Sequence, residues 1–464
     1  MKITFMGAAG GIVTGSCHFI DLGNFKALVD CGIFQGQRKI EDLNWEPFRF
    51  NPREIDVVFL THAHLDHTGR LPLLYKRGFR GKIIATDATR DLTYLILQDA
   101  TKLHYEAVER GRFRVRDKVI EEPMWTYEDV EGVMRLFQIY DYAERIKLNS
   151  RVEFRMREAG HILGSASYEL WLYNKAGRQR KVVFSGDLGQ TGARIIRDPD
   201  FIREADYVVV ESTYGGRYHK DKSTTILEFL SILDDVARDN SVAVVPTFAV
   251  ERAQEILYEL NLLREKEVID PGIKIFLDSP MAKKATLIFE RYRKYYDEDA
   301  LELVRAGDEI FRFKGLHIVE SSKESKKLKD VRKAMILAGS GMCTGGRVLH
   351  HLINFLPDPK NHIVFVGFQV PGTLGRRIID GAKQVKIFGK KIDVRAKVHT
   401  LGGFSAHADQ GDLMYWLRNF GHYPREIFIV HGDNDNRVAL DIKIKNELNL
   451  STNLPELFET YELD

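Results

Sequence analysis

The segment HAHLDH places His62, His64, Asp66 and His67 within six consecutive residues. It follows the apolar run DVVFLT, which predicts a buried strand, so the cluster falls on a turn between a strand and a loop. Imidazole nitrogens and carboxylate oxygens are ligands that suit Zn²⁺. A turn can direct these side chains toward two neighbouring points, which one face of a helix or strand cannot do. We therefore expect a metal site here rather than a histidine-rich turn held by hydrogen bonds.

Three later segments offer further ligands, each at the end of an apolar run. His161 follows VEFRMREA, Asp187 follows the strand KVVF, and His431 follows EIFI. A single His or Asp at a strand end is usually a cap or turn residue. In combination with the first motif, however, these residues could complete a two-metal site. Such sites hold ions about 3.5–4 Å apart around a bridging carboxylate.

The elements that must position these residues change along the chain. Up to residue 211, short apolar strands end in Gly, Asp or His, and a largely helical stretch lies between residues 87 and about 138. From residue 212 onward helix and strand alternate, which is typical of βαβ units on a parallel sheet. After residue 397 the first rhythm returns. Residues that could share one site therefore lie early and late, and the middle is predicted to be an inserted domain.

Composition restricts the class of protein without naming a substrate. A chain of 464 residues with 44% hydrophobic content is long enough for two compact units. The net charge of +2 excludes a bulk excess of basic residues, so a nucleic-acid surface would need local clusters. Cys17, Cys31 and Cys343 lack C-x-x-C spacing and predict no disulfide. No apolar run reaches the ~18 residues of a membrane span, the N-terminus predicts a strand, and we expect a soluble cytoplasmic protein.

The motifs together resemble a known family. HAHLDH, Asp30 at the end of ALVD, GHILGS, SGDLG and VHGD resemble motifs of the metallo-β-lactamase superfamily. Glu211 in VVESTYG, His407 in GFSAHAD, the late His431 and the segment GSGMCTGGRVLHHL resemble its β-CASP group. The closest resemblance is to the branch that contains the nuclease subunit of the eukaryotic pre-mRNA cleavage and polyadenylation factor and its prokaryotic relatives. It covers essentially the whole chain, without an appended KH domain.

The resemblance implies a fold and a set of metal ligands. The fold would be α/β, a four-layer αββα sandwich over residues 1–211 and 398–464, interrupted by a β-CASP domain over residues 212–397. Two zinc ions would be bound per chain, with Asp187 bridging them and Asp30 supporting their ligands. One ion would be held by His62, His64 and His161, and the other by Asp66, His67 and His431.

The resemblance also implies a reaction. Two zinc ions would acidify a water molecule, and the resulting hydroxide would attack an RNA phosphodiester in line. His407, oriented by Glu211, would protonate the departing 3′-oxygen, which leaves 3′-OH and 5′-phosphate ends. Asp66 and Asp30 would belong to the same catalytic group. Considered alone, His407 could instead be a structural residue near the start of a helix at Asp409, and Glu211 could simply pair with a lysine.

Single-stranded RNA is the expected substrate. DNA-directed members of the family usually carry valine where this chain has His431, and FSAHAD around His407 resembles the cleavage-factor branch. Internal cleavage is favoured over 5′→3′ exonuclease action, and both stay open. A homodimer and RNA-processing partner proteins are compatible with the sequence. The alternatives are a small-ester, thioester or lactone hydrolase of the same superfamily, a non-catalytic RNA-binding scaffold, and a DNA nuclease.

Other segments support two interpretations each. The Gly-rich residues 339–346 could present backbone N–H groups to a phosphate or form a tight structural turn, with Cys343 packed rather than catalytic. Basic clusters at residues 110–118, 323–333 and 386–397 are either solvated surface or tracks for a nucleic-acid backbone.

Overall fold

The computed structural model describes residues 1–463 apart from residues 110, 112–113 and 116–117. The chain divides into two compact units. Unit 1 comprises Met1–Ala193, Arg197–Tyr218 and His407–Asp464, and unit 2 comprises Arg194–Ile196 and His219–Ala406. Unit 2 is thus largely inserted between the second and third segments of unit 1. The domain limits expected at residues 211 and 397 stay a prediction.

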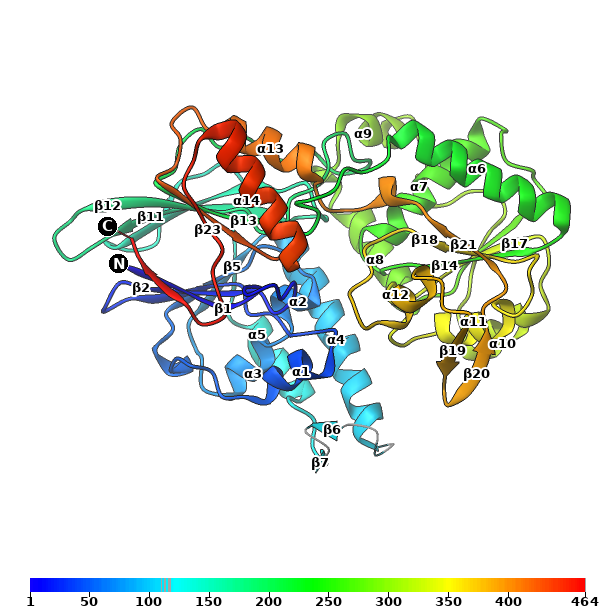
Figure 1. Cartoon of the computed structure of the whole chain (residues 1–464), viewed down its shortest axis with the longest axis horizontal. Helices are drawn as coiled ribbons and strands as arrows, with labels where there is room; N and C mark the ends of the chain where they lie inside the picture. The colour runs from blue at the N-terminus through cyan, green and yellow to red at the C-terminus, as the bar shows by residue number, and fades with distance from the viewer. Residues whose placement is uncertain (110, 112–113, 116–117, 464) are drawn as a thin grey trace. The chain divides into compact units, whose positions relative to one another are not determined.

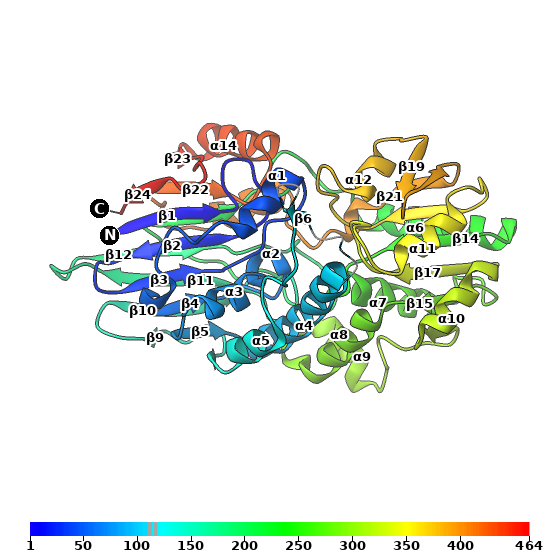
Figure 2. The same ribbon diagram turned by 90° about the horizontal axis from the view of Figure 1, so that it is seen from below.

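Unit 1 contains two seven-stranded sheets. In the first sheet, strands β1 to β5 lie side by side in Figure 2, and the full order is β24-β1-β2-β3-β4-β5-β8. The second sheet has the order β23-β22-β13-β12-β11-β10-β9. The first sheet comprises β1 (Lys2–Gly7), β2 (Cys17–Asp21), β3 (Lys26–Val29), β4 (Val57–Phe59), β5 (Lys82–Ala85), β8 (Phe137–Ile139) and β24 (Thr460–Glu462). The second comprises β9 (Ile146–Lys147), β10 (Val152–Glu158), β11 (Ala166–Tyr173), β12 (Gln179–Phe184), β13 (Tyr207–Glu211), β22 (Glu426–Val430) and β23 (Thr452–Asn453).

Helices cover the outer faces of both sheets, as Figure 1 shows for α3 and α5 on one side and α13 and α14 on the other. The helices of unit 1 are α1 (Arg38–Glu41), α2 (Leu65–Thr68), α3 (Leu71–Lys76), α4 (Asp87–Glu109), α5 (Tyr127–Met134), α13 (Gln410–Arg418) and α14 (Asn434–Leu448). A small ribbon joins β6 (Arg114–Val115) to β7 (Lys118–Val119).

Alternation along the strands explains the layers. Phe59 of β4 packs in the core between the sheets, whereas Val58 packs in the core under α3 and α5. On the second sheet, Val209 of β13 faces the other sheet and Val208 faces the helices α13 and α14. Successive strand side chains point to opposite faces, so a strand buried on both faces is apolar throughout. The αββα four-layer sandwich that the family resemblance implied is confirmed.

Unit 2 is built on a six-stranded parallel sheet with the order β16-β15-β17-β14-β18-β21. Its strands are β14 (Val242–Pro246), β15 (Lys274–Leu277), β16 (Leu316–Ile318), β17 (Ala334–Ala338), β18 (His362–Phe365) and β21 (Lys397–Thr400), with a separate ribbon of β19 (Gln384–Ile387) and β20 (Lys390–Asp393). Its helices are α6 (Lys222–Asp239), α7 (Arg252–Glu265), α8 (Pro280–Arg291), α9 (Glu298–Arg305), α10 (Ser322–Lys327), α11 (Val348–Phe355) and α12 (Leu374–Ile379). The predicted helix-strand alternation and parallel sheet are confirmed.

The stretch between residues 87 and 138 is largely helical, as its sequence predicts, but it is not one continuous helix. Helix α4 ends at Glu109 and α5 covers only Tyr127–Met134, with the β6–β7 ribbon between them. The basic cluster at residues 110–118 lies largely outside the described residues.

Candidate metal centre

The residues expected to do chemistry lie at the carboxyl ends of strands in unit 1. In the first sheet, Asp30 and His62 follow the parallel neighbours β3 and β4. In the second sheet, Asp187 and His431 follow β12 and β22, and Glu211 ends β13, which lies between these strands and is parallel to both. Carboxyl ends of parallel strands meet at one edge of a sheet. Residues from distant parts of the sequence therefore converge at this edge.

The segment HAHLDH occupies the connection between β4 and α2. His62 is fully buried, and His64 precedes the first residue of α2 with extended backbone. Asp66 and His67 lie in the first turn of that short helix. This change from strand to helix directs the side chains of one short segment to two places, as the sequence predicts.

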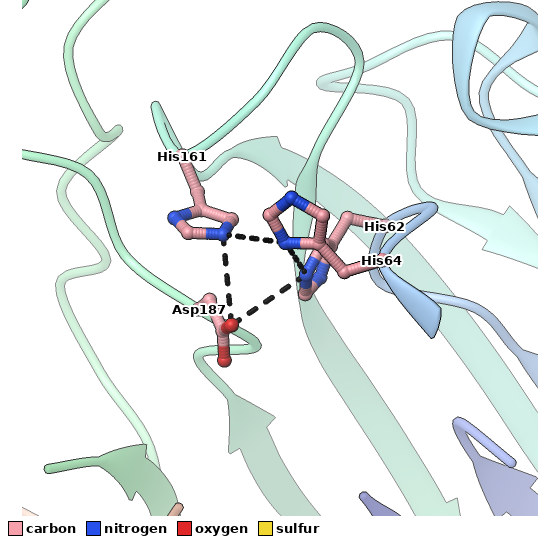
Figure 3. Close-up of side chains that lie close together, drawn as sticks. All are labelled: His62, His64, His161 and Asp187. Carbon is pink, nitrogen blue, oxygen red and sulfur yellow. Dashed lines mark hydrogen bonds and ion pairs between the residues drawn. The ribbon is translucent and has the colours of Figure 1, made fainter. Parts of the chain in front are cut away.

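The first cluster contains His62, His64, His161 and Asp187, whose ligand atoms all lie within 4.8 Å of one another (Figure 3). His64 Nδ1 lies 3.1 Å from both His62 Nε2 and His161 Nε2. Asp187 Oδ2 lies 3.5 Å from His62 Nε2 and 3.6 Å from His161 Nε2. A tetrahedral Zn²⁺ with Zn–N bonds of about 2.0–2.1 Å separates its ligand nitrogens by roughly 3.3 Å. The spacing of the ligand atoms therefore fits one ion.

The second cluster contains Asp66, His67 and His431. His431 Nε2 lies 3.1 Å from His67 Nε2 and 3.5 Å from Asp66 Oδ2. Asp187 reaches this cluster too, because its Oδ2 is 3.4 Å from His67 Nε2 and its Oδ1 is 3.6 Å from His431 Nε2. The Oδ1 atom is buried and accepts no hydrogen bond from the described residues. A buried carboxylate shared by two clusters suits a bridge between two cations.

The pKa values show where the site favours neutral and charged groups. Burial lowers the pKa of His62 well below its ordinary value and that of His64 to about 4, so both imidazoles keep a free lone pair. Burial also acts against a charge on His67, but Asp187 and Asp30 raise its pKa well above the ordinary value. Although burial favours the neutral form of Asp187, the surrounding imidazoles hold its pKa well below the ordinary value. The centre thus stabilises an anionic carboxylate next to positive charge, which metal ions would supply.

A layer of polar groups orients the ligands from behind. Asp30 Oδ2 accepts a hydrogen bond from His67 Nδ1 at 2.7 Å, and Asp30 Oδ1 accepts one from Thr61 N at 2.8 Å. Thr213 Oγ1 lies 3.1 Å from His431 Nδ1. Such contacts fix which imidazole nitrogen faces a metal. Asp30 has the supporting position that the family resemblance implies, whereas Thr61 and Thr213 were missed because a threonine beside a strand end is a common residue.

His407 and Glu211 form a pair beside the two clusters. His407 Nδ1 lies 3.2 Å from both carboxylate oxygens of Glu211. Glu211 is fixed in turn, because Oε1 accepts from Leu188 N at 2.7 Å and Oε2 from Thr213 N at 3.3 Å. Burial lowers the pKa of His407, but Glu211 and Asp187 raise it above the ordinary value overall. The side chain is 17% exposed, so the imidazole can hold a proton and is accessible from outside.

A third possible ligand group shares residues with the others. Asp187, Glu211 and His431 also bring ligand atoms within 4.8 Å of one another. Since both oxygens of Glu211 already accept backbone hydrogen bonds and face His407, we assign Glu211 to the orientation of that imidazole. Asp187 and His431 then remain with the two clusters above.

Three further sequence predictions concern features outside the two ligand clusters. Cys17, Cys31 and Cys343 are free and buried; Cys343 is packed, as predicted, and burial raises its pKa to about 12. In the Gly-rich segment, Ser340 Oγ accepts hydrogen bonds from the backbone N–H of Thr344 and Gly345. These amides are used within the loop, which favours the tight structural turn over a phosphate cradle. Among the described residues, no helix is both long and apolar enough to cross a membrane.

Comparison with known families matches three parts of the chain. Residues 10–141 match the metallo-beta-lactamase superfamily, residues 253–378 match the Beta-Casp domain, and residues 391–455 match the Zn-dependent metallo-hydrolase RNA specificity domain. The matches follow the same order as the motifs that the sequence shows.

Individual relatives extend over nearly the whole chain. The ribonuclease TTHA0252 of Thermus thermophilus is 42% identical over 441 residues, which are 95% of each chain. The transcription termination factor FttA of Methanosarcina mazei is 30% identical over 479 residues, which cover 100% of this chain and 72% of that protein. A solved structure of a protein of unknown function from Enterococcus faecalis has a TM-score of 0.53 at 12% identity, covers 100% of this chain and 99% of its own, and shows the fold alone. The chain belongs to the β-CASP group of the metallo-β-lactamase superfamily, as the motifs indicate.

Proposed function

We propose that this chain is a zinc-dependent ribonuclease that cleaves single-stranded RNA at internal phosphodiester bonds and leaves 3′-OH and 5′-phosphate ends. One observation carries the proposal. Two ligand clusters share Asp187, and the protonatable His407–Glu211 pair lies beside them. The similarity to the ribonuclease TTHA0252 of Thermus thermophilus and the match to an RNA specificity domain support RNA as the substrate.

The donor set fits two zinc ions. One ion would be held by His62, His64 and His161, and the other by Asp66, His67 and His431, with Asp187 between them. When bound, the ions would supply Lewis acidity that lowers the pKa of water and neutralises charge on phosphoryl oxygens. Asp30 would keep the Nδ1 proton of His67 in place, so that Nε2 faces the metal position.

The residues of the chain itself supply the proton transfer. Glu211 holds Nδ1 of His407 and favours its charged form, which places a proton on Nε2. His407 would donate this proton to the 3′-oxygen as the phosphorus–oxygen bond breaks, so that the leaving group departs as a neutral hydroxyl. Because the attacking group is not the 2′-OH, a single 2′-deoxy substitution at the cleaved bond should be tolerated.

The experiment that tests this proposal uses zinc-loaded protein, chelated protein, an internally labelled RNA with a blocked 5′ end and a matched DNA. Internal cleavage of the blocked RNA that disappears on chelation would support the proposal. Cleavage only of RNA with a free 5′-monophosphate would replace it with exonuclease action. A fully zinc-loaded protein that cleaves neither polymer would instead support a small-ester hydrolase or a non-catalytic scaffold.

We also propose that functional domains divide at residues 211 and 397, and that the chain can form a homodimer or bind RNA-processing proteins. Sedimentation of the purified chain alone and with RNA tests self-association, because a monomer under both conditions contradicts the dimer.

A further inference from the structure

The β19–β20 ribbon of unit 2 is an amphipathic element with one anchored face. The strands pair antiparallel, with Val385 opposite Ile392. Figure 1 shows the ribbon beside α11. Val385, Ile387 and Ile392 are buried in the core of unit 2. The ribbon is therefore held in place by its apolar face, and its other face is available at the surface.

The ribbon carries lysines that the fold leaves uncompensated. Lys383, Lys386, Lys390 and Lys391 are exposed, and none of them forms an ion pair with any residue that the structure describes. Strand alternation places Lys386 and Lys391 on the outer face, whereas Lys390 lies opposite Ile387 beside the turn. Lys386 lies directly opposite Lys391 in the register. Like charges in directly opposed positions destabilise a strand pair, so this arrangement costs stability.

Other basic residues close to the ribbon in sequence do form ion pairs. Arg395 Nη2 lies 3.2 Å from Asp393 Oδ2, and Lys397 Nζ lies 3.3 Å from Asp235 Oδ2 and 3.7 Å from Asp239 Oδ2. The basic cluster at residues 386–397 thus separates into a paired second half and a ribbon half whose positive charge is unbalanced. Only the ribbon half is suited to bind an anion from solution.

The turn of the ribbon also has a backbone conformation that is unfavourable for one of its residues. Phe388 and Gly389 have φ values of 49° and 82°, so both central residues of the two-residue turn are left-handed. Asn, Asp and Gly are preferred where such a hairpin turn begins, and a bulky residue with positive φ is uncommon. The Phe388 side chain is nevertheless 52% exposed, with its ring 5.0 Å from that of His350. Phe388 thus has an unfavourable backbone conformation although its side chain hardly contributes to the core. This combination points to a role in binding.

We propose that the β19–β20 ribbon is an auxiliary binding surface for single-stranded RNA. Lys386 and Lys391 on the outer face would contact consecutive phosphates, while one unpaired base stacks on Phe388 at the turn. Lysines that follow a backbone beside an exposed aromatic ring are the combination that binds single strands without reading sequence. The inference extends the proposed function, because it gives a long substrate a second contact in the unit that does not contain the metal centre.

The lysines are tested by direct binding. Zinc-loaded protein carrying His407→Ala is titrated into a fluorescein-labelled 20-nucleotide unstructured RNA at several salt concentrations, followed by fluorescence anisotropy. Adding Lys386→Ser and Lys391→Ser should weaken binding about tenfold and reduce the slope of log K against log salt by about 1.4, since each phosphate contact on a single strand contributes about 0.7. The matched control is Lys82→Ser with Lys147→Ser, two exposed lysines of unit 1, which should leave the slope unchanged.

The aromatic contact has its own variant. Phe388→Asn creates the Asn-Gly turn that this geometry prefers, so the melting temperature should stay the same or rise. RNA affinity should fall about fivefold or more, because a stacked base contributes about 1–3 kcal/mol. A variant that is as stable as the parent and binds RNA equally well would overturn the stacking contact, and unchanged salt slopes in the lysine variant would overturn the surface.

Failure of this inference is distinguishable from failure of the proposed function. Cleavage of a saturating four-nucleotide RNA should be the same in the parent and in all ribbon variants that keep His407, because these variants leave the metal ligands and the His407–Glu211 pair unchanged. If that RNA is cleaved but the ribbon variants bind the long RNA normally, the ribbon inference fails alone. If the ribbon variants lose affinity but no RNA is cleaved, the proposed function fails and the binding surface stands.

Discussion

At the scale of single residues, the centre separates side chains that would hold metal ions from one that would face the substrate. His407 belongs to the second kind, because its Nδ1 faces Glu211 and it is absent from both ligand clusters. His407→Ala should reduce RNA cleavage by about 10²–10⁴-fold while the zinc content stays at the parent level. Cleavage rates together with elemental analysis of the purified protein check this. Loss of zinc would instead make His407 a ligand.

Glu211→Gln tests whether the Glu211 carboxylate keeps His407 protonated. The amide is nearly the same size as the carboxylate but lacks the charge that raises the pKa of His407. We expect slower cleavage whose alkaline limb moves to lower pH, because less of the His407 imidazole carries a proton at a given pH. The pH profile distinguishes this role from a structural one, which would lower the rate equally at every pH.

Thr213 carries a second prediction at this scale. Its Oγ1 lies 3.1 Å from His431 Nδ1 and 3.2 Å from the His431 carbonyl oxygen, so it can accept from the ring and donate to the carbonyl. That arrangement leaves Nε2 free for a metal. Thr213→Val should weaken one of two zinc-binding steps by about 10–100-fold, measured by competition with a chromogenic chelator. Thr213→Ser should keep parent affinity, and equal weakening by both substitutions would contradict the hydrogen-bonding role.

At the scale of elements, β11 shows how a buried charge is built into a central strand. Glu169 is buried in the middle of the strand, and Lys181 at 2.7 Å, Arg157 at 3.0 Å and Arg155 surround its carboxylate. Burial alone would raise the pKa of Glu169, but Arg155 and Lys181 lower it to about 2. Glu169→Ala removes the shared anion and leaves buried Lys181 with only the exposed Glu204, at 3.7 Å, as an acidic partner. The free energy of unfolding should fall by about 3 kcal/mol, as measured by urea titration.

The pH dependence of the same group has a definite sign. Because the folded pKa is below the ordinary value of 4.5, the stabilisation by Glu169 is complete above about pH 4.5 and is lost as the pH falls toward 2. The stability difference between parent and Glu169→Ala should therefore shrink below pH 4.5. Glu153→Ala, which removes the partner of Arg145 in a more exposed pair, should cost no more than about 1 kcal/mol. Equal costs for both substitutions would contradict the role of burial.

This strand also shows what the sequence could and could not predict. Strands with clean apolar runs, such as β4 and β12, and the ligands at their ends were predictable, because strand period and ligand chemistry are local. β11 was missed, since Glu169 interrupts its apolar run and its compensating cations come from β10 and β12. The largely helical stretch between residues 87 and 138 was also predictable, but side-chain periodicity did not show that it divides into α4 and α5.

At the scale of the whole molecule, the metal centre connects parts of the chain that are far apart in sequence. His62, His64, Asp66 and His67 follow a strand of the first sheet, whereas His161, Asp187 and His431 follow strands of the second. Metal ions bound between these two groups of ligands would join the two sheets of unit 1. The ligands from one sheet are far in sequence from those of the other. The unfolded chain does not assemble these ligands, so the free energy of metal binding adds to the stability of the fold.

Metal removal should consequently destabilise unit 1 as well as abolish activity. A ligand that binds only the folded state at 1,000 times its dissociation constant contributes about 4 kcal/mol. We expect elemental analysis to give two zinc ions per chain and thermal melts to shift upward with zinc, relative to chelated protein. Asp187→Asn should lose most of this shift because Asp187 contacts both clusters, whereas His161→Ala and His431→Ala should each lose part of it. A zinc-independent melting temperature in the parent, or a full shift in Asp187→Asn, would contradict a shared centre that connects the two sheets.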